Sequence, residues 1–189
     1  MIQLQTDRLI IRDHLPEDLQ AMHSLLSNPV AMHYLQDIRT CTPDATALNL
    51  ETALAENNRL DRELFFFAII DRQTGAYIGE IGYTVKVRTP EGSIVGLGYF
   101  IKPEYWGRGI TTEAAKAVLR YAFEEGGVVK VESGCLRDNG ASQAVMIKLG
   151  MMKEADLRKH VWHDGALRDR VEYGMLKEDW ECLCITTKQ

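Results

Sequence analysis

A strand, a glycine turn and a helix are predicted in succession between Gly96 and Glu113. The run begins with β-prone apolar residues, stops at Pro103, turns at Gly107 and Gly109, and continues into an alanine-rich segment. The first turn of a helix leaves backbone N–H groups without intrahelical partners, and glycine lets an anion approach the backbone closely. The pattern therefore predicts a turn that binds a diphosphate. A plain connection that binds nothing has the same pattern, so the spacing alone leaves both interpretations open.

This turn resembles a known cofactor motif. It lacks the Gly-Lys-Ser/Thr ending of a P-loop, but it is similar to the acetyl-coenzyme A motif of the GNAT superfamily of N-acetyltransferases, Gln/Arg-x-x-Gly-x-Gly/Ala. Gly109 stands at the invariant glycine, whereas Trp106 and Thr111 depart from the other two marked positions. In this family the backbone N–H groups of the loop hold the diphosphate. The resemblance implies acetyl-CoA as cofactor and a binding loop made of Trp106, Gly107, Arg108, Gly109, Ile110 and Thr111.

A second motif follows about thirty residues downstream. Asn139 to Met151 resembles the family segment N-x-x-S-x-x-x-x-x-K-x-G-F, with Met151 in place of the usual Phe. The resemblance implies that Asn139 binds the pantetheine arm of the cofactor, and an ordinary helix N-cap is the alternative. The resemblance also implies that Ser142 donates a proton to the cofactor sulfur. The alternative is that Ser142 is solvated or caps the helix. Many relatives place a tyrosine acid where this chain has Met146, which closes that route.

Two further features of the family concern the transfer itself. Adjacent parallel strands splay apart beside the loop, and the resemblance implies that backbone groups of Phe100 and Ile101 pair with pantetheine and the acetyl oxygen. Many relatives carry a glutamate base where this chain has Gly96. Glu80, on the neighbouring predicted strand, is the substitute candidate, and a surface carboxylate on a half-exposed strand is the alternative. Two histidines near the last predicted hairpin titrate near neutrality and are further candidates for the base: His160 and His163.

The acceptor is expected to be a primary amine. An α-amino group has a pKa of roughly 7.7–8.0 and a lysine side chain one near 10.4, so a chain without an obvious base favours a protein N-terminus or a small-molecule amine over lysine. Residues 6–12 and 169–180 also resemble the branch that includes ribosomal-protein N-terminal acetyltransferases. Two alternatives stay open at this point, namely a non-catalytic acyl-CoA-binding regulatory module and an enzyme that uses a longer acyl donor.

Bulk properties narrow the class of protein. With 22 basic and 27 acidic residues the net charge is −5, which argues against nucleic acid as a partner. No basic, apolar leader or membrane-length apolar run is present, so a cytoplasmic protein without membrane contact is expected. The four cysteines show no C-x-x-C spacing, which predicts reduced thiols and no metal site. Whether the chain is a monomer or a homodimer stays open.

The pattern of apolar residues predicts one domain of the α/β class over residues 1–189, and the resemblance implies that it is an N-acetyltransferase domain. The expected centre is a mixed, mostly antiparallel sheet of about seven strands flanked by helices. The resemblance implies that the parallel pair in the middle of this sheet is splayed. The predicted strands span residues 4–12, 64–70, 76–88, 93–102, 128–135, 151–162 and 167–176. The predicted helices span residues 16–26, 30–35, 42–58, 110–125 and 139–149.

Overall fold

A computed structural model describes residues 1–186 of the chain. Its strands are β1 (Gln3–Gln5), β2 (Leu9–Asp13), β3 (Leu64–Asp71), β4 (Tyr77–Thr89), β5 (Gly92–Ile101), β6 (Val128–Leu136), β7 (Met152–His163) and β8 (Ala166–Leu176). Its α-helices are α1 (Leu19–Leu26), α2 (Pro43–Glu56), α3 (Ile110–Glu124), α4 (Gly140–Lys148) and α5 (Lys177–Thr186). Short 3₁₀ turns lie at η1 (Pro16–Asp18), η2 (Gln36–Ile38) and η3 (Pro103–Tyr105).

The strands are hydrogen-bonded in the order β1-β2-β3-β4-β5-β6-β8-β7. The β5–β6 pair is parallel, and the β1–β2, β2–β3, β3–β4, β6–β8 and β7–β8 pairs are antiparallel. This confirms the predicted mixed sheet with one parallel pair. The sheet has eight strands because the single first strand expected over residues 4–12 is interrupted at Thr6, whose Oγ1 accepts the Leu9 N–H at 3.0 Å and closes a turn.

Chain contacts divide the protein into two compact units. The first unit comprises residues 1–84 and 98–118, and the second comprises residues 85–97 and the described residues from 119 onward. Strands β4 and β5 contribute residues to both units. The single domain over residues 1–189 stays a prediction.

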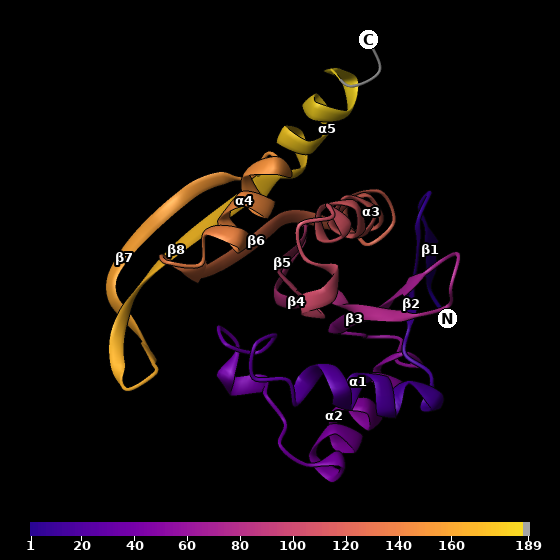
Figure 1. Ribbon diagram of the computed structural model, residues 1–189. Coiled ribbons are helices and arrows are strands. Elements are labelled where there is room, and N and C mark those ends of the chain that lie inside the picture. Colours follow the sequence, from indigo (N-terminus) through magenta and orange to yellow (C-terminus); the bar gives the residue numbers. More distant parts are fainter. Residues whose placement is uncertain (187–189) are drawn as a thin grey trace. The chain divides into compact units, whose positions relative to one another are not determined.

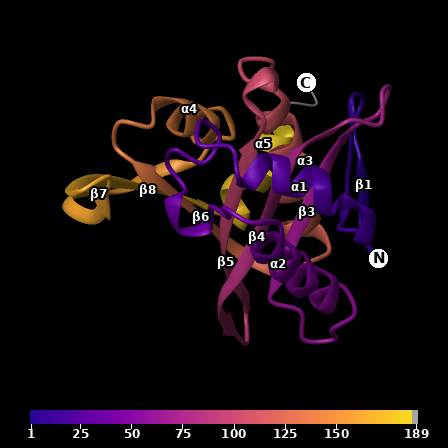
Figure 2. The same cartoon turned by 60° about the horizontal axis from the view of Figure 1, so that its bottom comes forward.

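In the first unit, α1 and α2 cover one face of the strands (Figures 1 and 2). Their buried apolar residues form one cluster with three residues of the strands: Met22, Leu25, Leu26, Met32 and Leu50 with Ala68, Tyr77 and Phe100. The helix predicted at residues 42–58 is present as α2, and Thr42 caps it by accepting the Ala45 N–H at 3.3 Å. The short helix predicted over residues 30–35 is instead a run of turns.

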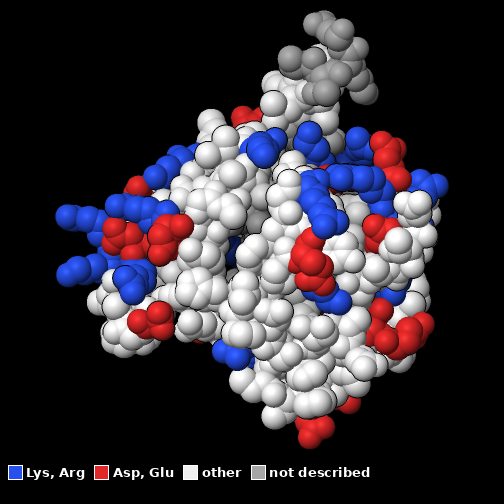
Figure 3. All heavy atoms as spheres, in the orientation of Figure 1, with Lys and Arg blue, Asp and Glu red and all other residues white. Residues whose placement is uncertain are grey.

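In the second unit, β7 and β8 form a long hairpin whose turn holds Asp164 at φ 50° and Gly165 at φ 73°. Two successive residues with positive φ are what a two-residue hairpin turn of type I′ requires, so the predicted last hairpin is confirmed. Lysine and arginine side chains gather on this hairpin (Figure 3). Helix α5, which the sequence did not predict, stacks Trp180 on Phe123 of α3 at 5.4 Å between ring centroids.

Two negative findings concern the described residues 1–186. None of the helices in this range combines the length and the apolar composition needed to cross a membrane. All four cysteines are free thiols, as predicted.

Candidate active site

The predicted phosphate loop connects η3 to the start of α3 in the first unit. Gly107 and Gly109 both adopt φ 73°, a conformation that costs a residue with a Cβ about 1–2 kcal/mol. A Cβ at Gly107 would meet no atom within 4 Å, and one at Gly109 would meet only Arg8, 3.8 Å away. The glycines are therefore required by the backbone path, and the space above them is open to a ligand.

The donors of this loop suit an anion. Within residues 1–186, no hydrogen bond uses the backbone N–H groups of residues 107–112, and the first backbone bond of the helix joins Glu113 N to Gly109 O at 3.0 Å. These N–H groups lie at the positive end of a helix dipole, where a phosphate is stabilised. The Arg108 guanidinium stands 5.6 Å from the Tyr105 ring and adds positive charge at the edge of the loop. The residues present therefore fit a diphosphate.

Arg8, which the sequence analysis did not single out, holds the loop from the start of β2. Its Nη1 donates to Arg108 O at 3.0 Å and its Nε to Glu113 Oε2 at 2.6 Å. Thr6 Oγ1 donates to the other oxygen of Glu113 at 2.5 Å. Burial would raise the pKa of Glu113, but these hydrogen bonds outweigh it and lower that pKa. The carboxylate thus stays ionised and ties the start of α3 to the β1–β2 turn.

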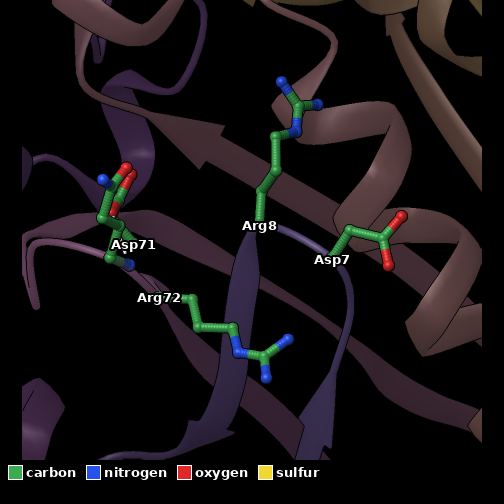
Figure 4. A pocket seen from close by; sticks show the side chains of 5 residues that line it. Asp7, Arg8, Asp71 and Arg72 are labelled. Atoms are coloured by element: carbon green, nitrogen blue, oxygen red, sulfur yellow. Dashed lines mark hydrogen bonds between the residues drawn. The ribbon is translucent and has the colours of Figure 1, made fainter.

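Arg8 also borders a hollow of about 400 Å³, together with Asp7, Asp71, Arg72 and Gln73. Figure 4 shows the side chains of Arg8 and Arg72 extending away from each other. The Arg8 side chain borders this hollow, and it also hydrogen-bonds to Glu113 and to the Arg108 carbonyl.

Trp106 is directed back toward β5. Its indole N–H donates to Ile101 O at 3.0 Å, so one of the backbone groups expected to be open already has a partner. The reason is that tryptophan at the Gln/Arg position carries a donor that reaches the end of the preceding strand. Phe100 and Ile101 themselves are buried. The indole thus fixes the path between β5 and the loop.

Glu80 lies inside the protein, and the surface alternative considered for it is wrong. Glu80 as a whole residue is 3% exposed. Glu80 is the cross-strand partner of Ala68, which packs in the cluster beneath α1 and α2, and cross-strand partners share one face of a sheet. Tyr77 donates its hydroxyl to Glu80 Oε1 at 2.9 Å. Burial raises the pKa of Glu80, and the neighbouring His14 and the Tyr77 hydrogen bond only partly oppose that rise.

Glu80 is also beside the end of β5. A Cβ on Gly79, the preceding residue, would be 2.5 Å from Phe100 O, and Lys102 N donates to Ile78 O at 2.9 Å. Side chains at these adjoining positions are neighbours across the two strands. The structure therefore brings Glu80 together with Phe100 and Ile101 in the first unit.

Asn139 and Ser142 belong to the second unit. Asn139 caps α4 by accepting the Ser142 N–H on Oδ1 at 3.1 Å, so the capping interpretation holds. The Asn139 side-chain NH₂ group has no partner among residues 1–186 and remains available as a donor. Ser142 is half-buried and neighbours Cys135, whose thiol donates to Asn139 O at 3.8 Å. Burial raises the pKa of that thiol, and the neighbouring Ser142 opposes the rise.

The other positions considered for acid–base chemistry have different surroundings. Met146 is fully buried in the second unit. A Cβ at Gly96 would lie 2.7 Å from the Lys86 side chain, whose Nζ is 2.9 Å from Glu132 Oε2. Lys86 therefore covers the place where many relatives carry a glutamate.

The two candidate histidines of the β7–β8 hairpin differ from each other in exposure. His160 is exposed to solvent, whereas His163 is buried. Neither shares the first unit with Glu80 and the loop.

Comparison with known proteins agrees with this geometry. A family model described as an acetyltransferase (GNAT) domain matches residues 8–152. The chain belongs to the GNAT family. An uncharacterized N-acetyltransferase of Bacillus subtilis, YoaA, is 30% identical over 179 residues, which cover 92% of this chain and 96% of YoaA.

Two further relatives of this GNAT protein extend over nearly the whole chain. The [Ribosomal protein uS5]-alanine N-acetyltransferase of Escherichia coli is 26% identical and covers 95% of this chain, which covers 93% of it. The crystal structure of a GNAT-family acetyltransferase from Bacillus anthracis superimposes with a TM-score of 0.78 at 25% identity, over 94% of this chain and 99% of that one.

GNAT enzymes transfer the acetyl group of acetyl-CoA to an amine, and this chain is accordingly an acetyl-CoA-dependent N-acetyltransferase. The family, the cofactor and the reaction class predicted from the two motifs are confirmed. Those motifs did not indicate Arg8 and Thr6. Both fall in the run that resembles the family's opening strand, but nothing in that run shows that it ends against the loop.

Proposed function

We propose that this enzyme acetylates the α-amino group of a protein N-terminus by direct transfer, and that Glu80 accepts the proton of the attacking amine. The observation that carries the proposal is the buried Glu80 carboxylate beside Phe100 and Ile101 at the end of β5. A relative that is 26% identical over almost the full chain acts on a ribosomal-protein alanine, which supports an N-terminal acceptor.

The residues that would hold acetyl-CoA are assigned by the groups they offer. Gly107, Arg108, Gly109, Ile110 and Thr111 present backbone N–H donors for the diphosphate, and Trp106 fixes the loop. Asn139 offers its side-chain NH₂ group to the pantetheine arm. The backbone groups of Phe100 and Ile101, apart from the Ile101 carbonyl that Trp106 occupies, are assigned to the acyl end. Bound acetyl-CoA supplies an activated thioester carbonyl.

Glu80 has the surroundings that a general base needs. Its pKa is raised chiefly by burial, and a base whose pKa approaches the working pH combines a usable ionised fraction with a strong tendency to take a proton. The Tyr77 hydroxyl, 2.9 Å away, holds Oε1 and leaves Oε2 for another partner. An α-amine with a pKa of roughly 7.7–8.0 demands far less of such a base than a lysine near 10.4.

Ser142 is the proposed donor of the proton that the CoA thiolate takes up when the thioester C–S bond breaks, and the Ser142 hydroxyl regains a proton from solvent. It lies in the first turn of α4, and its N–H is held by the Asn139 cap. The hydroxyl of a serine rotates freely enough to exchange one partner for another, so its contact with Cys135 is compatible with this role.

The test is thiol release from acetyl-CoA with N-terminal alanine and serine peptides, spermidine and free amino acids as acceptors. Turnover of the peptides is expected. In Glu80→Gln we expect kcat to fall about 100-fold or more at neutral pH. In Ser142→Ala we expect kcat to fall about tenfold. Glu132→Gln, a carboxylate of the second unit, is the matched control and keeps the wild-type rate.

Two outcomes would contradict the proposal. Turnover of spermidine without turnover of any peptide assigns the enzyme to small amines and removes the N-terminal acceptor. A Glu80→Gln variant as active as Glu132→Gln removes Glu80 from the reaction. Calorimetric titration with CoA on the same samples shows whether a loss of rate reflects a loss of cofactor binding.

A further inference from the structure

A buried polar cluster lies in the first unit at the end of β2. His14, which no sequence motif indicated, is at its centre and is 1% exposed. Its Nε2 is 3.8 Å from Glu80 Oε2, and its Nδ1 is 3.7 Å from Asp18 Oδ2. Neither ring nitrogen makes a hydrogen bond in the described part of the chain. A buried polar ring without partners is costly, so its place between two carboxylates calls for an explanation.

Asp18 is held in place by groups other than His14. Arg12 grips both of its oxygens, with Nη1–Oδ2 at 2.7 Å and Nη2–Oδ1 at 2.8 Å. The Leu15 N–H donates to Oδ2 at 2.8 Å. Burial would raise the pKa of Asp18, but the hydrogen bond from Arg12, the neighbouring His14 and the Leu15 N–H lower that pKa far below its usual value. Asp18 is therefore a fixed negative charge beside Nδ1 of His14.

The charges of the cluster do not balance with His14 and Glu80 in their usual forms. Asp13 is paired with Arg62 at 2.8 Å, and Asp18 is paired with Arg12. Glu80 has no lysine or arginine partner among the described residues; His14 is its one ion-pair neighbour. An ionised Glu80 next to a neutral His14 leaves one uncompensated negative charge in the interior, so the cluster favours the uptake of one proton.

The remaining titratable groups around His14 do not compensate this negative charge. The Tyr77 ring, at 6.5 Å between centroids, donates its hydroxyl to Glu80. Glu17 of η1 is exposed, and Glu56 at the end of α2 is satisfied by Arg59 and by the N–H groups of Glu63 and Leu64. Helix α1 contains no carboxylate. Asn57 donates to the His14 carbonyl at 3.2 Å, which holds its backbone.

We propose that His14 is a positioning residue that orients Glu80 through Nε2 and relieves it of the proton taken from the acceptor amine, with Asp18 stabilising the resulting imidazolium at Nδ1. This inference rests on the proposed role of Glu80. An N–H bond of the amine breaks and an O–H bond forms at Glu80. The proton then passes to His14 Nε2 while Asp18 stays ionised, and it returns to solvent by the reverse transfers after the product leaves.

The distance of 3.8 Å between His14 and Glu80 must shorten by about 1 Å for this transfer. Catalytic hydrogen bonds that are long in an empty site tighten when the substrate is bound. Rotation of the Glu80 carboxylate is compatible with that change because the Tyr77 hydroxyl holds only Oε1.

The first experiment compares His14→Gln with His23→Gln. Glutamine at position 14 keeps an amide near Nε2 but cannot take up a proton. His23 is a half-buried histidine of the same unit whose Nδ1 contacts Thr46 Oγ1 at 2.8 Å, so it is the matched control. We expect His14→Gln to lower kcat about 10-fold to 100-fold at neutral pH, with KM for acetyl-CoA unchanged.

The pH profile separates a proton relay from a structural role. Loss of the imidazole removes a group that favours ionised Glu80, so the acid limb of the kcat profile should move about one pH unit higher in His14→Gln. His23→Gln keeps the wild-type profile. An equal loss of rate at every pH in a folded His14→Gln protein, or no loss at all, would overturn the proposal.

A second measurement does not depend on turnover. In ¹⁵N NMR spectra of the imidazoles, Glu80→Gln should move the Nε2 signal of His14 and Asp18→Asn its Nδ1 signal, while the His23 signals stay in place. Unmoved His14 signals would refute the relay even in an active enzyme. Moved signals in a protein that acetylates no amine would refute the proposed function and leave the coupling of His14 to the two carboxylates standing.

Discussion

The two units of this enzyme contain ion pairs of similar composition in opposite surroundings. In the first unit, the side chains of Asp13 and Arg62 are 0% and 7% exposed. In the second, those of Lys86 and Glu132 are 49% and 30% exposed, and Lys130 of β6 and Glu154 of β7 form a similar pair. The distances within the two pairs are nearly equal, at 2.8 and 2.9 Å. Geometry alone therefore does not distinguish them.

The difference lies in the water that each pair has lost. A buried charge has given up its hydration, so removal of its partner leaves that loss without compensation. A half-exposed charge is rehydrated when its partner is removed. The Asp13–Arg62 and Asp18–Arg12 pairs therefore hold fixed charges in a dehydrated part of the first unit, while Lys86–Glu132 and Lys130–Glu154 lie on a solvated surface of the second.

The largest effect should come from Arg62→Met, which keeps most of the side-chain volume and strands the Asp13 carboxylate. We expect a loss of about 3–5 kcal/mol in the free energy of unfolding, measured by urea denaturation. The Asp13→Asn, Arg62→Met double variant should recover part of the loss because no charge is then left alone. A loss below about 1 kcal/mol in the single variant would show that the pair behaves like a surface pair.

The second effect concerns pH and has opposite signs in the two units. Burial raises the folded-state pKa of Glu80 above its unfolded value of about 4.3. The wild type therefore loses stability as pH rises from the unfolded-state pKa of Glu80 to its folded-state pKa. The Glu80→Gln variant has no carboxyl group at this position and does not show this loss. Each pKa unit contributes about 1.4 kcal/mol, so Glu80→Gln should be more stable than the wild type at neutral pH while being less active.

Glu132 is the matched control, because its contribution to stability is expected to change with pH in the opposite direction. Its pKa is lowered, chiefly by the hydrogen bond from Lys86, so its contribution to stability is present above its unfolded pKa and is lost as pH falls. Thermal melts from pH 3 to pH 8 should show the melting temperature of Glu80→Gln rising relative to that of the wild type as pH increases, and that of Glu132→Gln falling relative to it. Parallel curves for the two variants would contradict the assignment of Glu80 as a carboxylate with a raised pKa.

The Arg8–Glu113 pair sharpens the comparison because it is exposed and yet holds a functional loop. The Arg8 side chain is 51% exposed, so Arg8→Met should change stability by less than about 1 kcal/mol. Its loss frees the Arg108 carbonyl and the start of α3, and we expect the Kd for CoA to rise about tenfold, or about 1.4 kcal/mol. Calorimetric titration measures this, with Arg72→Met as control. An unchanged Kd would mean that the loop keeps its shape without Arg8.

The smallest effect should be that of Lys86→Met in the second unit. A pair this exposed contributes about 0.2–1 kcal/mol and is screened by salt. Urea denaturation at low salt and at about 1 M salt should show the difference from the wild type disappearing in the second condition. The loss in Arg62→Met should persist at both salt concentrations. A salt-independent loss in Lys86→Met would break the contrast between the two units.

The parts of the site that sequence analysis found are local in the chain. The turn at Gly107 and Gly109 can be recognised because strand, glycines and helix are consecutive, and the positive φ of both glycines follows from the same residues. The Asn139 cap is equally local, since its partner is the Ser142 N–H three residues on. Interactions confined to one segment leave a pattern in the order of residues.

The parts that sequence analysis missed are joined across the fold. Glu80 was named from the sequence as the candidate base, but its burial was not predicted, because alternation along one strand does not say which face is covered. Its burial follows from the pairing with Ala68 and from the helices above that face. His14 stands alone after a strand, with no motif around it, and becomes notable only where Asp18 and Glu80 meet it.

The sequence by itself determined the family, the cofactor, the reaction class and most of the order of the elements, because each rests on short runs whose backbone chemistry is set by neighbouring residues. Only the tertiary structure decided which carboxylates are dehydrated, which arginine holds the loop and which histidine lies between two acids. The physical reason is that hydration and pKa depend on the groups that surround a side chain in space. In this protein those groups come from segments as far apart in the chain as Arg8 and Glu113.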